Sequence, residues 1–130
     1  MNILIADHDL ASADRISQEF NIMGHRAEIC TSCEEALTRI KSQEFDLVLL
    51  DLLLSDGGGE KCIAHIKEIR PRVEIVAMTE HNSRELELKV RSQGILFYMI
   101  KPFEINYLKV LADHISQIKI ARDPQPIVNL

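Results

Sequence analysis

Polar side chains that could do chemistry stand where four apolar runs of the chain end. Asp7 follows NILIA, Asp51 interrupts LVLLDLLL, Thr79 follows EIVAM and Lys101 follows LFYMI. If the strands holding Asp7 and Asp51 are neighbours, their carboxylates need a cation to offset their repulsion, and Mg²⁺ is the natural candidate. A carboxylate in such surroundings could accept a phosphoryl group as an acyl phosphate. Asp51 is the favoured nucleophile, because an apolar run tolerates a charge only for a reason.

The elements that must position these side chains are strands covered on both faces. Five short apolar runs, NILIA, AEIC, DLVLLDLLL, EIVAM and LFYMI, recur without regular alternation of apolar and polar residues, as in a parallel sheet. The segments between them place apolar residues at helical spacing. This alternation predicts (βα) repeated five times, a doubly wound α/β fold whose ligands gather beyond the carboxyl ends of its strands.

Capping signals indicate where the helices begin. Ser32 with Glu35, and Asn82 with Glu85, have the spacing of capping boxes, in which the first side chain accepts a hydrogen bond from a backbone N–H. Asp9 is expected to cap the first helix in the same manner. The third and fourth helices are predicted at about Gly59–Ile69 and Ser83–Gln93.

Composition excludes several classes of protein. The chain has 130 residues, 46% of them hydrophobic, and a net charge of −5, which predicts one domain with one core. Its apolar runs are too short to span a membrane, and its start has no basic region typical of a secretory signal, so we expect a cytoplasmic protein. Without a block of Lys and Arg, direct nucleic-acid binding is not expected. The partner is expected to be another protein or a cation.

The motifs LIADHD, DLVLLDLLLSDGGG, VAMTE and YMIKPF stand in an order and at a spacing that resemble a known family. The chain is similar, over Met1 to Ala121, to the receiver domains of bacterial two-component response regulators. The resemblance implies a CheY-like sheet order of 2-1-3-4-5, and it implies that Asp51 takes a phosphoryl group from a sensor histidine kinase, a phosphotransfer protein or a small phosphodonor. Residues 122–130 would be a tail or the start of a linker.

The same resemblance implies roles for further residues. Mg²⁺ would be held by Asp7, Asp51 and the backbone carbonyl of Leu53. Lys101 would contact the phosphoryl oxygens, and its bond to Pro102 would be cis. Thr79 and Tyr98 would form a switch pair that reshapes the face of the fourth helix, fifth strand and fifth helix. A downstream protein would read the signal at that face. Such a domain is not a turnover enzyme, although it assists its own phosphorylation and dephosphorylation, and it is expected to be a monomer or a weak dimer.

His8 departs from the family, which has a second acid at that place. Mg²⁺ prefers oxygen ligands, so an imidazole there should weaken its binding. Asp56 could lean in from the following loop to replace the missing acid. Three consequences are open: phosphorylation with weaker Mg²⁺ dependence, which we favour, a preference for a nitrogen-tolerant ion such as Mn²⁺, or a phosphorylation-independent adaptor. His8 could also lie on the surface beside the cleft without contacting a metal.

Two other features suggest different chemistry. Cys30 and Cys33 form a C-x-x-C pair at a helix start, which could act as a thiol redox motif. The alternative, which we favour, is that both pack as small apolar residues, and Cys62 is expected in the core. The glycines at 57–59 lack the Lys and Ser/Thr of a P-loop and favour a flexible loop instead.

Overall fold

A computed structural model describes residues 1–122 of the chain, and its sheet is a five-stranded parallel one in the order β2-β1-β3-β4-β5. The elements follow one another as β1 (Asn2–Ala6), α1 (Leu10–Ile22), β2 (Arg26–Cys30), α2 (Cys33–Ser42), β3 (Leu47–Asp51), α3 (Gly59–Ile69), β4 (Glu74–Thr79), α4 (Arg84–Arg91), β5 (Phe97–Ile100) and α5 (Asn106–Arg122). The predicted doubly wound α/β fold and its strand order are confirmed.

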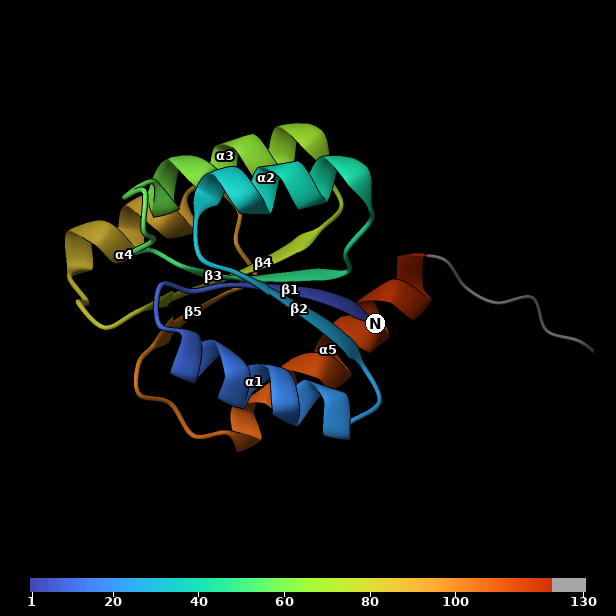
Figure 1. Ribbon diagram of the computed structural model, residues 1–130. Helices are drawn as coiled ribbons and strands as arrows, with labels where there is room; N and C mark the ends of the chain where they lie inside the picture. Colours follow the sequence, from blue (N-terminus) through green and yellow to red (C-terminus); the bar gives the residue numbers. More distant parts are fainter. Residues whose placement is uncertain (123–130) are drawn as a thin grey trace, which may run out of the picture.

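Helices cover both faces of the sheet (Figure 1), with α1 and α5 on one side and α2, α3 and α4 on the other. Successive strand residues point to opposite faces. Accordingly, Ile3 and Leu49 pack with Phe20 of α1, whereas Leu4 and Val48 belong to the core on the other face. Because both faces are buried, the strands contain uninterrupted apolar runs rather than alternating ones.

The helix starts follow the predicted caps with one exception. The Asp9 side chain accepts hydrogen bonds from two backbone N–H groups of α1, and Ser32 accepts one from Glu35. Asn82 does not cap α4; Ser83 does, accepting a hydrogen bond of 3.0 Å from the N–H of Leu86. The amide oxygen of Asn82 instead accepts the Tyr98 hydroxyl at 2.8 Å. The expected capping residue was therefore wrong by one position, and α4 is shorter than predicted.

The glycines after β3 have separate structural reasons. Gly57 has a φ of +70°, a conformation that glycine adopts without steric cost. Gly59 is the first residue of α3 and is buried, and a Cβ there would overlap the backbone of Leu52. The segment is thus held close to β3, and a flexible loop is not an adequate description of it.

Predictions about the end of the chain fall mostly outside the described residues. The proposed domain limit at residue 121 lies inside α5, which is described to Arg122, and the tail at 123–130 is not described. Among the described residues, no helix is long and apolar enough to cross a lipid bilayer.

Candidate functional site

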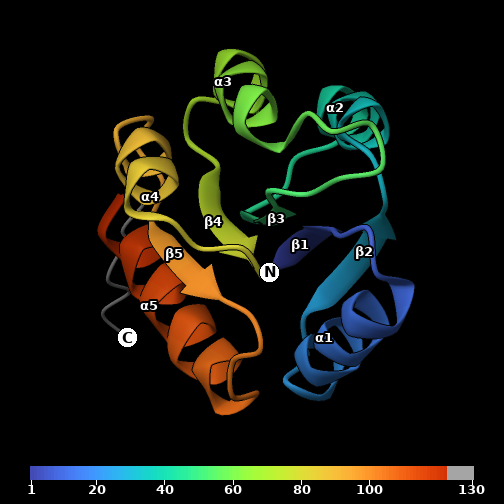
Figure 2. The same ribbon diagram turned by 90° about the vertical axis from the view of Figure 1, so that its left-hand side faces the viewer.

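The site lies at the carboxyl edge of the sheet, where β1 and β3 are neighbours (Figure 2). The order β2-β1-β3 makes this the point where successive connections leave in opposite directions, the usual ligand crevice of doubly wound sheets. Asp7 follows β1 and Asp51 ends β3, and their residues are 0% and 1% exposed. The sheet therefore brings together two buried carboxylates, as the sequence predicted.

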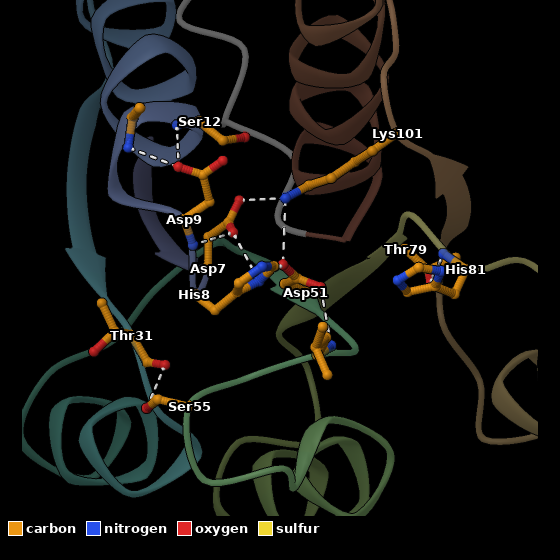
Figure 3. A network of polar contacts seen from close by, with 12 residues as sticks. Asp7, His8, Asp9, Ser12, Thr31, Asp51, Ser55, Thr79, His81 and Lys101 are labelled. Carbon is orange, nitrogen blue, oxygen red and sulfur yellow. Dashed lines mark hydrogen bonds and ion pairs between the residues drawn. The ribbon is translucent and has the colours of Figure 1, made fainter.

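Lys101 joins these two carboxylates from the end of β5. Its Nζ lies 2.7 Å from Oδ2 of Asp7 and 3.2 Å from Oδ2 of Asp51 (Figure 3). The peptide bond between Lys101 and Pro102 is cis, as predicted. A buried ammonium group between two acids offsets their repulsion, which is what a pair of buried carboxylates requires.

Burial and pairing act against each other on these groups. Burial raises the pKa of Asp7, and the hydrogen bond from Lys101 offsets this only in part. For Lys101, burial by itself lowers the pKa, but the hydrogen bond and charge of Asp7, together with Asp51, outweigh it, so the pKa of Lys101 is raised. Lys101 is therefore held as a cation in the site.

His8 turns its ring into the site rather than away from it. Its Nδ1 lies 2.6 Å from Oδ2 of Asp51 and 3.6 Å from Oδ1 of Asp7, while a third of the side chain remains exposed. Figure 3 shows the ring beside the Asp51 carboxylate. This contact with Asp51 could not be read from the sequence, and whether His8 contacts a metal is not decided by it.

Every carboxylate oxygen of the pair has a donor. Oδ1 of Asp7 accepts the N–H of Asp9 at 2.9 Å, and Oδ1 of Asp51 accepts the N–H of Leu53 at 2.9 Å. The remaining oxygens face Lys101 and His8. Both carboxylates are thus fixed in orientation by backbone on one oxygen and by side chains on the other. Metal ligation by the Leu53 carbonyl stays a prediction.

The predicted switch residues, Thr79 and Tyr98, make their contacts outside the pair of acids. Thr79 is buried, and its hydroxyl accepts the N–H of His81 at 3.1 Å. Within residues 1–122, no hydrogen bond links Thr79 to Asp51, and Figure 3 shows the two side chains apart. The Tyr98 hydroxyl donates to Asn82, and the Arg91 guanidinium lies over the Tyr98 ring. Tyr98 is half-buried in this arrangement.

Asp56 does not replace the missing acid. Its carboxylate accepts the N–H groups of Cys33 and Glu34 at 3.0 and 3.2 Å, at the start of α2. These backbone hydrogen bonds, that of Cys33 foremost, lower the pKa of Asp56. A helix N-terminus attracts a carboxylate through its free N–H groups, and for this physical reason the possible replacement of the missing acid by Asp56 is wrong.

Cys30 and Cys33 are not paired with each other in this structure, as the alternative of a redox motif would require. Cys33 forms a disulfide with Cys62 of α3, whereas Cys30 is a free, buried thiol. Burial raises the pKa of Cys30 to about 12, opposite to what a reactive thiol needs. The sequence gives no signal for the Cys33–Cys62 bond, because it depends on how α2 packs against α3.

The donor set fits Mg²⁺ only in part. Asp7, His8 and Asp51 can each offer one ligand atom, and these atoms lie within 4.8 Å of one another. The carboxylate oxygens suit Mg²⁺, but an imidazole nitrogen does not. The three side chains therefore differ from an all-oxygen site in one donor, the imidazole of His8.

Comparisons with known proteins agree with this geometry. A family model described as the response regulator receiver domain matches residues 3–113. The transcriptional regulatory protein ZraR of Escherichia coli K12 is 28% identical over 109 residues, which are 84% of this chain and 25% of that protein. The DNA-binding transcriptional regulator NtrC of Azospirillum brasilense is 28% identical over 82% of this chain and 22% of its own length. The chain thus spans about a quarter of these relatives.

Solved structures show the same fold over nearly the whole chain. A CheY-like response regulator receiver domain protein from Methanospirillum hungatei has a TM-score of 0.86 at 26% identity, over 92% of this chain and 97% of that one. A two-component response regulator from Clostridium difficile has a TM-score of 0.85 at 29% identity, with 90% and 96% covered. With the match over residues 3–113, this chain belongs to the family of response regulator receiver domains.

Proposed function

We propose that Asp51 is the phosphoacceptor of this receiver domain and that phosphorylation changes its contacts with other proteins in the cytoplasm. The observation that supports this most is the position of the Asp51 carboxylate, which is buried at the sheet edge and meets Lys101 at 3.2 Å. A buried carboxylate is held ready for attack when a fixed ammonium group can take up the charge of the arriving phosphoryl oxygens.

The proposed transfer involves residues of this site, a divalent ion held beside them and a phosphodonor. An Asp51 oxygen attacks phosphorus, the phosphorus–nitrogen bond of a phosphohistidine or the phosphorus–oxygen bond of an acyl phosphate breaks, and the leaving group departs with its electron pair. Lys101 would move its hydrogen bond from Asp51 to a phosphoryl oxygen. Water attacking the same phosphorus in line would later return the carboxylate and release phosphate. The domain thus assists its own phosphorylation and dephosphorylation without turning over a separate substrate.

The proposed metal requirement is weaker than the family pattern implies. Asp7, Asp51 and the Leu53 carbonyl would hold a divalent ion beside the reacting oxygens. Because His8 supplies nitrogen in place of a third carboxylate, Mg²⁺ is expected to bind less tightly here than at an all-oxygen site.

The proposed output surface lies on β5 and α5, next to Tyr98. Four large apolar side chains are 40% to 64% exposed there: Phe97, Ile100, Tyr107 and Val110. They line a hollow of about 320 Å³ that Tyr98 also borders. An exposed apolar patch of this kind suits a protein partner, and movement of Tyr98 would change its shape. The input partner would be a sensor histidine kinase or phosphotransfer protein.

Intact-mass measurement after incubation with acetyl phosphate and Mg²⁺ or Mn²⁺ tests the proposal. Wild type should gain the mass of one phosphoryl group, and Asp51→Asn should not. Asp113→Asn, which removes an exposed carboxylate on α5, is the matched control and should react like wild type. No adduct on wild type with either ion would refute the proposal and favour a phosphorylation-independent adaptor.

A further inference from the structure

We propose that this site selects a nitrogen-accepting divalent ion of the Zn²⁺ and Co²⁺ class over Mg²⁺, with Nδ1 of His8 as a ligand beside Asp7 and Asp51. The inference deepens the proposed function, since it concerns the ion that would accompany phosphorylation of the same site. It rests on the direction of the His8 ring, which the sequence left open, and on the charge that His8 removes from the site.

The separations from His8 to the two acids are close to those that one ion requires. Metal–ligand distances of about 2.0–2.2 Å place adjacent ligand atoms about 3 Å or more apart. Nδ1 of His8 lies 3.6 Å from Oδ1 of Asp7, which fits, and 2.6 Å from Oδ2 of Asp51, which must open slightly. The exposed third of the His8 side chain leaves room for that shift, so an ion can replace the direct contact between His8 and Asp51.

The two carboxylates are prepared as ligands by their other hydrogen bonds. The N–H of Leu53 fixes Oδ1 of Asp51, so Oδ2 faces His8. Lys101 holds Oδ2 of Asp7 at 2.7 Å. Partners that orient ligands in this way increase metal affinity. The His8 ring has to move away from Asp51 for an ion to enter between them.

Charge and donor type both favour the same class of ion. With a neutral imidazole, the charges of Asp7 and Asp51 against Lys101 leave one net negative charge, where a third carboxylate would leave two. Mg²⁺ binds through charged oxygens and sheds its water reluctantly, so it loses most from this change. Zn²⁺ and Co²⁺ accept imidazole readily and rank above Mn²⁺ for mixed nitrogen and oxygen sites. The site therefore favours the transition ions.

Equilibrium titration with Co²⁺, Zn²⁺ and Mg²⁺, without a phosphodonor, tests this selectivity. Wild type should bind Co²⁺ and Zn²⁺ more tightly than Mg²⁺. His8→Asp should weaken Zn²⁺ and strengthen Mg²⁺, each by about tenfold. His8→Ala should weaken Zn²⁺ without gain for Mg²⁺. Co²⁺ should also shift imidazole proton resonances in the NMR spectrum of wild type, and these shifted signals should be missing from both His8 variants.

His81→Asp is the matched control, because exposed His81 lines the same hollow as Lys101 but is not one of the clustered donors. It adds the same charge and should leave the selectivity unchanged. Equal selectivity in wild type and His8→Asp, or Mg²⁺ binding as tightly as Zn²⁺ to wild type, would overturn the inference. A phosphoryl adduct formed without such selectivity defeats this inference alone, whereas selective binding without any adduct defeats only the proposed phosphorylation.

Discussion

Among single side chains, Lys101 neutralises buried charge, because its Nζ lies between two carboxylates that are 0% and 1% exposed. Lys101→Ala would leave those charges buried without their ammonium partner. We expect the free energy of unfolding to fall by about 3 kcal/mol, the usual cost of breaking a buried ion pair. Urea denaturation at neutral pH measures the change.

Lys119→Ala is the matched control for this prediction. Lys119 also lies 2.6 Å from a carboxylate, that of Asp46, but half of its side chain is exposed. Exposed pairs contribute less than about 1 kcal/mol, so the control should lose little stability. Similar losses in the two variants would contradict the electrostatic role assigned to Lys101.

The residues at the strand ends could be predicted, but the directions of loop side chains could not. Asp7, Asp51 and Lys101 follow or end strands, and parallel strands bring their carboxyl ends to one edge. His8 and Asp56 lie in loops, where no regular alternation sets the side-chain direction. His8 therefore contacts Asp51, and Asp56 caps α2, in ways that only the structure reveals.

Between elements, α3 packs tightly against the segment after β3 at Gly59. Gly59→Ala would push a Cβ into the backbone of Leu52, so we expect a loss of at least about 2 kcal/mol in the free energy of unfolding. Gly58→Ala is the control, because a Cβ there meets only the Cβ of Cys33, at an ordinary 3.7 Å. Equal denaturation midpoints for the two variants would contradict this close packing.

Helix positions were more predictable than the contacts that fix them. The predicted limits of α3 are confirmed, since the apolar spacing determines them. Asn82 and Ser83 both have side chains that can cap α4. Ser83 does so, whereas Asn82 accepts a hydrogen bond from Tyr98 of β5. The Cys33–Cys62 disulfide likewise depends on helix packing and lay outside what spacing alone could indicate.

For the whole molecule, the buried Cys30 thiol predicts a loss of stability at alkaline pH. Its pKa in the folded protein is raised from 9.0 to about 12 by burial. Between these values the unfolded chain loses the thiol proton while the folded one keeps it. The free energy of unfolding should therefore fall with rising pH, by up to about 1.4 kcal/mol per pH unit from this group.

Chemical denaturation of wild type and Cys30→Ala measures this contribution. The measurements run from about pH 8 to about pH 11, the range in which an ordinary thiol titrates. The variant loses packing at every pH, but its stability should decline less steeply, because the titrating group is gone. Lys101, whose pKa is raised, adds a decline of the same sign in both proteins. Parallel pH profiles would show that Cys30 ionises alike in the folded and unfolded states.

The fold class could be predicted because the apolar runs and the helical segments of the sequence both indicate it. Apolar runs without alternation indicate strands buried on both faces, and the helical segments between them require parallel connections. The order of the strands came from the resemblance to receiver domains, since periodicity does not determine which strands are neighbours. That order places β1 beside β3 and so creates the pair of acids.

The assignment of Asp51 as phosphoacceptor is tested most directly by locating the phosphoryl group. Wild type is treated with acetyl phosphate and a divalent ion, reduced with borohydride, which converts an aspartyl phosphate to homoserine, and mapped by peptide mass spectrometry. We predict homoserine at position 51 and an unchanged Asp7. Homoserine at another aspartate, with residue 51 intact, would contradict the assignment.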